Sequence, residues 1–129
     1  MTAKAIVFVV DDEQIVRDSL AALLHVAGYE TRLYSTAVEF LEDYDPKPVG
    51  CILADIRMPG MDGLSMLRRL ATLQSHAPVI VMTGHADRQL ARDALANGAA
   101  AFLEKPFDHV DLINRIEQAT RQDNDRVRS

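Results

Sequence analysis

Short apolar runs alternate with longer amphipathic segments along the whole chain. Five of these runs are short enough for strands, and several are rich in valine and isoleucine. They are Ala5–Val10, Thr31–Tyr34, Val49–Ala54, Val79–Met82 and Ala101–Leu103. The pattern therefore predicts five strands separated by longer elements.

In the segments between these runs, apolar residues recur every three or four positions, which is the spacing of one helix face. The first predicted helix ends at Gly28, the second follows a capping box of Thr36 and Glu39, and the third spans Leu64–Leu73. The fourth is alanine-rich and has few large apolar groups. The fifth follows Asp108 as its N-cap. Helices thus alternate with the predicted strands.

This strict alternation predicts an α/β fold with a doubly wound parallel sheet. Parallel strands need crossover connections, and helices supply them on both faces of the sheet. In such sheets ligands bind outside the carboxyl ends of the strands, so candidate functional residues follow each strand.

Composition narrows the class of protein. The 129 residues suffice for one domain with a real core, and 48% hydrophobic with 26% charged residues is typical of a globular chain. A net charge of -5 argues against binding to nucleic acid or an anionic membrane. No segment is apolar enough for a signal peptide or a membrane span, and the single cysteine, Cys51, cannot form an internal disulfide. We therefore expect a soluble, cytoplasmic protein.

Polar residues stand where four of the predicted strands end. Asp11 and Asp12 follow the first strand, Asp55 the third, Thr83 the fourth and Lys105 the fifth. Crowded carboxylates repel one another unless a cation offsets them, and an all-oxygen site suits Mg²⁺ better than zinc. A carboxylate beside Mg²⁺ and a lysine can attack phosphorus, and Asp55 is the best candidate nucleophile.

Four segments carry a resemblance to a known family. They read VVDDE at 9–13, LADIRMPGMDG at 53–63, VMTGH at 81–85 and FLEKPF at 102–107. Together they resemble the receiver domain of two-component response regulators, closest to the FixJ-type subgroup. The resemblance implies a flavodoxin-like (βα)₅ fold with strand order 2-1-3-4-5.

The same resemblance implies a role for each matching residue. Asp55 is the expected phosphoacceptor, Lys105 the counter-charge of the phosphate, and Thr83 with Phe102 the switch pair. The expected Mg²⁺ ligands are Asp12, Asp55 and the backbone carbonyl of Arg57, with Asp11 acting through water. Two further expectations are a cis peptide bond before Pro106 and an influence of Arg57 and His85 on the loss of the phosphoryl group.

The resemblance also implies partners and a domain layout. We expect a receiver domain over 1–121, and the start of a linker or polar tail over 122–129. The implied partners are a sensor histidine kinase and, on phosphorylation, a second copy of the chain. Related proteins usually carry a DNA-binding output domain, so the chain is either an excised receiver or a stand-alone regulator, and the polar tail favours the former.

The resemblance and the composition of the fourth helix together suggest how the switch operates. A thinly apolar fourth helix is weakly held, so movement at Thr83 can displace it and let Phe102 turn inward. The output surface is then the fourth helix, fifth strand and fifth helix. On the first helix, Ile15, Ala22 and Val26 lie opposite the core stripe and form an apolar strip on which a kinase can dock.

Two other functions compete with the phosphoacceptor switch. An aspartate-nucleophile phosphohydrolase of the haloacid-dehalogenase type also uses Mg²⁺, threonine and lysine, but it needs an aspartate at position 57, where this chain has arginine. If the chain were an inactive sheet protein, the presence of these carboxylates, the threonine and the lysine at the strand ends would be a coincidence. The switch, which catalyses only its own phosphorylation and dephosphorylation and is otherwise no enzyme, is the preferred interpretation.

Overall fold

The computed structural model describes residues 5–45, 50–75 and 77–128. Strands and helices alternate along the chain, with one short 3₁₀ turn (η1) before the fourth helix. In order they are β1 (Ile6–Val10), α1 (Gln14–Val26), β2 (Glu30–Tyr34), α2 (Ala37–Asp43), β3 (Gly50–Asp55), α3 (Gly63–Thr72), β4 (Val79–Thr83), η1 (His85–Asp87), α4 (Arg88–Ala96), β5 (Ala101–Glu104) and α5 (His109–Arg128).

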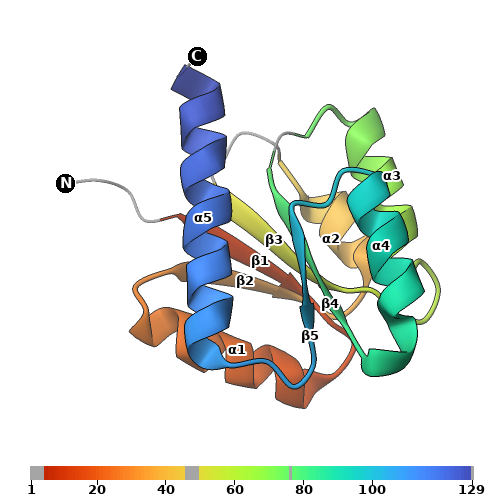
Figure 1. Cartoon of the computed structure of the whole chain (residues 1–129), viewed down its shortest axis with the longest axis horizontal. Helices are drawn as coiled ribbons and strands as arrows, with labels where there is room; N and C mark the ends of the chain where they lie inside the picture. The colour runs from red at the N-terminus through yellow and green to blue at the C-terminus, as the bar shows by residue number, and fades with distance from the viewer. Residues whose placement is uncertain (1–4, 46–49, 76, 129) are drawn as a thin grey trace.

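The strands form one parallel sheet in the order β2-β1-β3-β4-β5 (Figure 1). β1 lies between β2 and β3, with Val9 opposite Leu33 on one side and Leu53 on the other. The fold class and the strand order predicted from the sequence are confirmed.

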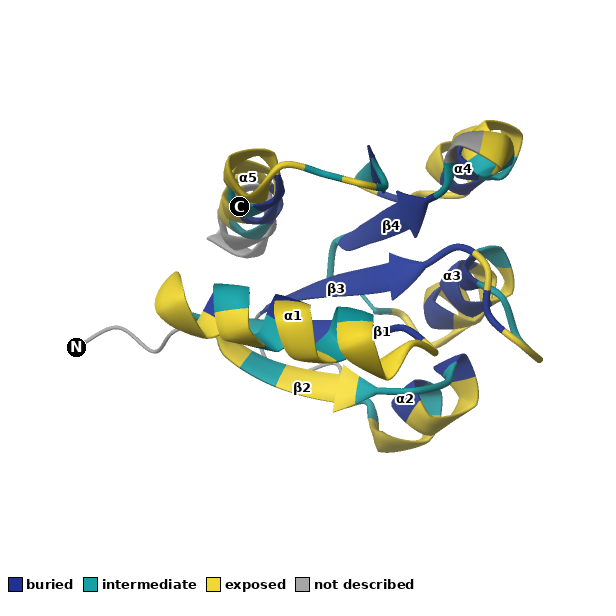
Figure 2. Ribbon diagram, turned by 90° about the horizontal axis from the view of Figure 1, so that it is seen from below, coloured by how far each residue is buried: buried dark blue, intermediate teal, exposed yellow. Residues whose placement is uncertain are grey.

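Side chains of each strand alternate between two helical layers. Val7 and Val9 of β1 pack with α1 and α5, whereas Phe8 and Val10 pack with α2 and α3. Figure 2 shows α1 and α5 on one face of the sheet and α2, α3 and α4 on the other. Because both faces of the inner strands are covered, β3 and β4 are buried along their whole length.

Local sequence determines where several helices begin and end. Thr36 Oγ1 accepts a hydrogen bond from Glu39 N at 3.0 Å at the start of α2, as its capping box predicts. Asp62 caps α3 in the same way, and Asp108 Oδ1 accepts from Val110 N at 3.1 Å at the start of α5. Gly28 ends α1 with a φ of 95°, a conformation that glycine adopts without strain.

The observed elements differ from the predicted ones at their ends. Asp55, Thr83 and Glu104 are the last residues of their strands rather than the first residues beyond them. α5 continues through Arg128, so residues 122–128, expected to begin a linker, are helical; no glycine or proline follows Thr120 to stop the helix. Val49 and Ser129, which fell within a predicted strand and the predicted tail, lie outside the described residues.

None of the helices in the described ranges is long and apolar enough to cross a membrane.

Candidate phosphoacceptor site

The candidate site lies at the carboxyl edge of the sheet. Asp11 and Asp12 follow β1, Asp55 and Thr83 end β3 and β4, and Lys105 follows β5. Parallel strands bring these positions to one edge, and Figure 2 shows the arrowheads of β3 and β4 pointing to the same side. The structure thus places at one edge the residues that the sequence singled out.

Three carboxylates converge there. One oxygen from each of Asp11, Asp12 and Asp55 lies within 4.8 Å of the others. Asp11 is fully buried, Asp55 is 8% exposed and Asp12 is open to solvent. Asp11 Oδ1 accepts a hydrogen bond from Glu13 N at 2.9 Å, and Asp55 Oδ1 accepts one from Arg57 N at 3.1 Å. Backbone donors therefore fix the orientation of both buried carboxylates.

Lys105 supplies the counter-charge. Its Nζ lies 3.3 Å from Asp11 Oδ2 and 3.3 Å from Asp55 Oδ2, so one ammonium bridges the two buried carboxylates. Lys105 N donates to Thr83 O at 2.7 Å, which holds the β5–α5 loop against the end of β4. The Lys105–Pro106 peptide bond is cis, as the resemblance implies.

Burial and charge shift the acidity of this pair. Burial raises the pKa of Asp55 above its ordinary value, and the Lys105 ammonium opposes that rise. Burial acts to lower the pKa of Lys105, but the charges of Asp55 and then Asp11 outweigh it, so the net pKa of the ammonium is raised. The lysine is therefore charged at neutral pH.

The donor set fits a magnesium ion. It consists of carboxylate oxygens with one exposed member, Asp12, through which an ion can reach the two buried ones. Hard oxygen ligands with room for water are the set that Mg²⁺ prefers. Among the residues that the structure describes, no nitrogen or sulfur ligand belongs to this cluster, which argues against zinc.

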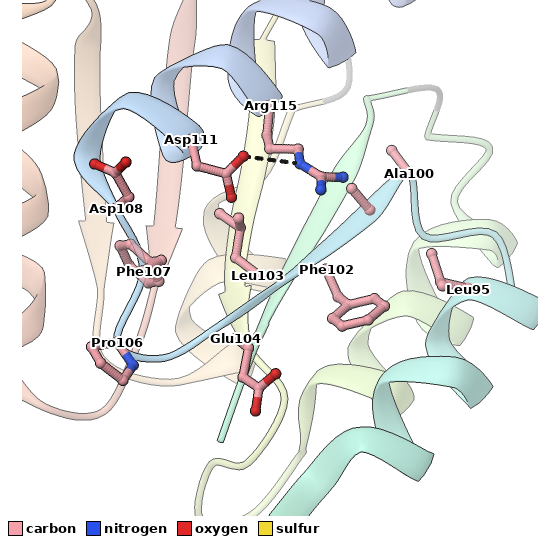
Figure 3. Close-up of a pocket in the computed structure, with 11 residues that line it drawn as sticks. Leu95, Ala100, Phe102, Leu103, Glu104, Pro106, Phe107, Asp108, Asp111 and Arg115 are labelled. Carbon is pink, nitrogen blue, oxygen red and sulfur yellow. Dashed lines mark ion pairs between the residues drawn. The ribbon is translucent and has the colours of Figure 1, made fainter. Parts of the chain in front are cut away.

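The two residues of the expected switch pair are not members of the carboxylate cluster. Thr83 is fully buried, and its hydroxyl donates to Gly84 O at 3.0 Å. Phe102 is partly buried, and Figure 3 shows its ring on the side of β5 that faces Leu95 of α4. In α4 only Ala91 and Ala94 are buried among the described residues, which agrees with the thin apolar face read from the sequence.

Arg57 has a partner that the sequence did not reveal. Its Nε donates to Asp87 Oδ1 at 2.5 Å, joining the loop after β3 to η1. Asp87 does not follow a strand directly and lies 30 positions from Arg57, so no pattern in the sequence marked it. The backbone of His85 belongs to η1, but its side chain lies outside the described residues, so its expected influence stays a prediction.

A groove next to the site contains one end of the predicted docking strip. It is lined by Ile15 and Leu23 of α1 and by Pro106, Phe107 and His109 beyond β5. Ile15 is 80% exposed and Val26, at the far end of α1, is 85% exposed, as predicted. Arg17 Nη1 donates to Asp11 O at 2.7 Å and so ties α1 to the site.

The chain matches the family described as "Response regulator receiver domain" over residues 7–117. The chain belongs to this family. Response regulator receiver domains are phosphorylation-activated signalling switches of two-component systems, and this is the general function of the chain. Neither the family match nor the relatives below support the phosphohydrolase alternative.

FixJ proteins are prominent among the similar relatives. The chain is 44% identical to "Transcriptional regulatory protein FixJ" of Bradyrhizobium diazoefficiens over 95% of this chain and 60% of the relative, and 46% identical to FixJ of Azorhizobium caulinodans over 85% of this chain and 52% of that relative. The resemblance to the FixJ-type subgroup is confirmed.

Solved structures agree with these relatives. The crystal structure of full-length FixJ from B. japonicum superposes with a TM-score of 0.90 at 43% identity, covering 95% of this chain and 60% of that one. The crystal structure of FixJ-N has a TM-score of 0.87 at 38% identity and covers 93% of this chain and 96% of that one. The chain thus spans 52–60% of these full-length relatives and nearly all of FixJ-N.

Proposed function

We propose that Asp55 accepts a phosphoryl group from a sensor histidine kinase. One observation carries the proposal: the Asp55 carboxylate lies 3.3 Å from a lysine ammonium and within 4.8 Å of two further carboxylates, a set suited to a divalent cation. An aspartate in such a setting is equipped as a nucleophile toward phosphorus. The general function of the family supports this assignment.

Each residue has a definite part in the transfer. A carboxylate oxygen of Asp55 forms a bond to phosphorus as the bond from phosphorus to the donor atom breaks, and the donor leaves with that electron pair and takes up a proton. Asp12, Asp55 and the Arg57 carbonyl would hold Mg²⁺, with Asp11 acting through water, and the bound ion would supply positive charge toward the phosphoryl oxygens. Lys105 supplies the second positive charge. Later, a water molecule attacks the phosphorus, the bond from phosphorus to the Asp55 oxygen breaks, and inorganic phosphate leaves, which restores the Asp55 carboxylate.

The output is a changed surface over α4, β5 and α5. The new phosphoryl oxygens draw the Thr83 hydroxyl from Gly84 O toward Asp55, because a charged acceptor binds a hydroxyl more strongly than a neutral carbonyl does. Movement at Gly84 then shifts the weakly held α4 and gives Phe102 room to turn inward. We propose that this surface controls pairing with a second copy and, in a longer protein, a DNA-binding output domain.

The proposal includes the extent of the receiver domain and its location in the cell. Residues 1–121 form the receiver, and in a longer protein the helix that continues beyond them would connect it to an output domain. The cytoplasm is the predicted location. Apart from its own phosphorylation and dephosphorylation, the domain catalyses no reaction.

Intact mass spectrometry tests the central step. The protein is incubated with phosphoramidate and Mg²⁺, and one labile phosphoryl adduct is expected. The adduct should disappear in Asp55→Asn and in EDTA, and it should persist in the matched variant Asp18→Asn, which removes an exposed carboxylate of α1. An adduct that survives in Asp55→Asn would contradict the proposal, as would a folded protein that neither forms an adduct nor releases phosphate from the donor.

A further inference from the structure

The ion pair between Arg57 and Asp87 is asymmetric in its exposure. The Asp87 side chain is 13% exposed, whereas the Arg57 side chain is 69% exposed. A largely covered carboxylate depends on its counter-charge, while an exposed guanidinium can move to another partner at little cost. The pair therefore holds Arg57 in one position without burying it.

Arg57 also begins beside the candidate phosphoacceptor. Its backbone N–H donates to Asp55 Oδ1 at 3.1 Å, and its side chain branches from the carbon bonded to that nitrogen. The guanidinium is therefore within one side-chain length of Asp55, but the Asp87 carboxylate binds it instead. Lys105, by contrast, already contacts the Asp55 carboxylate.

Phosphorylation of Asp55 changes the competition for this guanidinium. A phosphoryl group adds about -1.5 to -2 charges and several acceptor oxygens. Its oxygens match the planar fork of arginine and bind it more strongly than a single carboxylate oxygen does. An arginine beside Asp55 thus gains a better partner than Asp87 once the phosphoryl group is present.

We propose that Asp87 is a positioning residue, an inference that rests on the proposed phosphorylation of Asp55. Asp87 holds the Arg57 guanidinium in the unphosphorylated protein, and a phosphoryl group on Asp55 competes with Asp87 for that guanidinium. Arg57 then acts on the phosphoryl oxygens as a further cation, in addition to Lys105 and the metal ion. Asp87 sets the strength of that contribution because it must first release the arginine.

The exchange has a consequence for α4. Two ion pairs hold the adjacent residues at its start. Arg57 pairs with Asp87, and Glu104 pairs with Arg88, with Glu104 Oε2 3.1 Å from Arg88 Nη2. Loss of the first ion pair leaves the second, toward β5. Phosphorylation thereby loosens the start of α4 on the side that faces the loop after β3.

A double-mutant cycle tests the competition. Binding of beryllium trifluoride with Mg²⁺, a mimic of the phosphoryl group, is measured by calorimetry for the wild type, Asp87→Asn, Arg57→Gln and the double variant. Asp87→Asn should bind the mimic about two- to fivefold more tightly, the range expected for one partly exposed charge pair. In the Arg57→Gln background the Asp87→Asn change should have no effect, because no guanidinium remains to be released.

Glu104→Gln is the matched control. It also removes one carboxylate charge next to the start of α4, but it frees Arg88 rather than Arg57. Its affinity for the mimic should stay at the wild-type value. The Arg57 Nε–H resonance, assigned by its loss in Arg57→Gln, should move when the mimic binds to the wild type and should already be displaced in Asp87→Asn.

Distinct outcomes separate the two proposals. Absence of Asp55-dependent binding of the mimic to the wild type would refute the proposed function and, with it, this inference. If the wild type binds the mimic normally, three results would refute the role of Asp87 but not the proposed function. Asp87→Asn could leave the affinity unchanged, it could have the same effect in the Arg57→Gln background, or Glu104→Gln could have the same effect as Asp87→Asn. If Asp87→Asn does not fold, the wild-type Arg57 Nε–H resonance still decides, since a resonance unmoved by the mimic overturns the proposal.

Discussion

Lys105 Nζ lies 3.3 Å from Asp55 Oδ2, although the two residues are 50 positions apart in the sequence. The contact arises because β3 and β5 both end at the carboxyl edge of the sheet, with β4 between them. The ammonium offsets the charge of Asp55 before any phosphoryl group arrives. The same charge is then available to the oxygens of an incoming phosphoryl group.

Replacement of Lys105 by methionine should slow phosphorylation of Asp55 about tenfold or more, because a preorganised charge on the transferring oxygens is lost. The measurement is the rate of adduct formation with phosphoramidate at fixed Mg²⁺. Lys105→Arg, which keeps the charge but changes its geometry, should retain more of the rate than Lys105→Met. Equal rates for the wild type and Lys105→Met would show that the ammonium takes no part in the transfer.

Asp12→Asn should weaken Mg²⁺ binding about tenfold, since one charged oxygen ligand of the cluster becomes a neutral amide. Asp12 is exposed, so the free energy of unfolding should change by less than about 0.5 kcal/mol. Titration calorimetry measures the affinity, and urea denaturation measures the stability. The control Asp18→Asn removes an equal charge from α1 and should leave the affinity almost unchanged; a similar loss in both variants would point to general electrostatics rather than to coordination.

The fold and the carboxylate cluster could be predicted because both follow from local pattern. Runs of valine and isoleucine mark the strands, and a parallel sheet necessarily collects the residues at their carboxyl ends. The pattern therefore predicted that Asp11, Asp55 and Lys105 lie close together. Their assignment to a phosphoacceptor site came from the resemblance, which the pattern alone did not supply.

Other features depend on tertiary packing and left no trace in the pattern. The Arg57–Asp87 ion pair joins the loop after β3 to η1 through one exposed and one largely covered side chain, and polar residues outside strands are too common to mark a partner. The first helix was predicted to end at Gly28, but α1 ends at Val26, and Ala27 is exposed because the chain turns at Gly28. The segment after Thr120 has a single apolar residue, Val127, and therefore lacks the apolar spacing of a helix face, although α5 continues to Arg128.

Gly63→Ala should destabilise the protein by about 1–3 kcal/mol. A Cβ at this position would lie 2.8 Å from Asp55 O and 2.9 Å from Ile56 Cα, and both are backbone atoms with little freedom to move. The loop that follows the phosphoacceptor would therefore shift, and phosphorylation should slow as well. Urea denaturation measures the stability, and adduct formation measures the activity.

The matched variant is Gly84→Ala. Its Cβ would meet only the end of the Asp87 side chain, at 3.9 Å, and its φ of -83° suits any residue. Reduced freedom of the unfolded chain should make this variant more stable by about 0.4–1 kcal/mol. If Gly63→Ala were equally stabilised, close backbone packing at Gly63 would be refuted.

Tyr34 should ionise about two pH units later than a free tyrosine. Burial, followed by a hydrogen bond from its hydroxyl to Asp43 Oδ2, raises its pKa to about 12. Because the folded pKa exceeds the unfolded value of about 10, the contribution of Tyr34 to stability is complete below pH ~10 and is lost as pH rises toward 12. NMR of ¹³Cζ-labelled tyrosines measures the titration, with Tyr34→Phe to assign the signal. Asp43→Asn should lower this pKa, and an unchanged titration in that variant would rule out the contribution of Asp43.

Ile15→Glu should slow phosphotransfer from a histidine kinase about tenfold while leaving phosphorylation by phosphoramidate unchanged. Ile15 is 80% exposed and lines the groove beside Pro106 and Phe107, so a kinase that presents its phosphohistidine to Asp55 would cover it. A charge there would be desolvated in the complex without a partner. Val26→Glu is the control, since Val26 is equally exposed but lies at the far end of α1 and does not line the groove. The measurement is the rate of transfer from a phosphorylated kinase to each variant. Equal slowing in both variants would show that the docking surface extends along the whole of α1. No slowing in Ile15→Glu would show that the groove is not part of the interface.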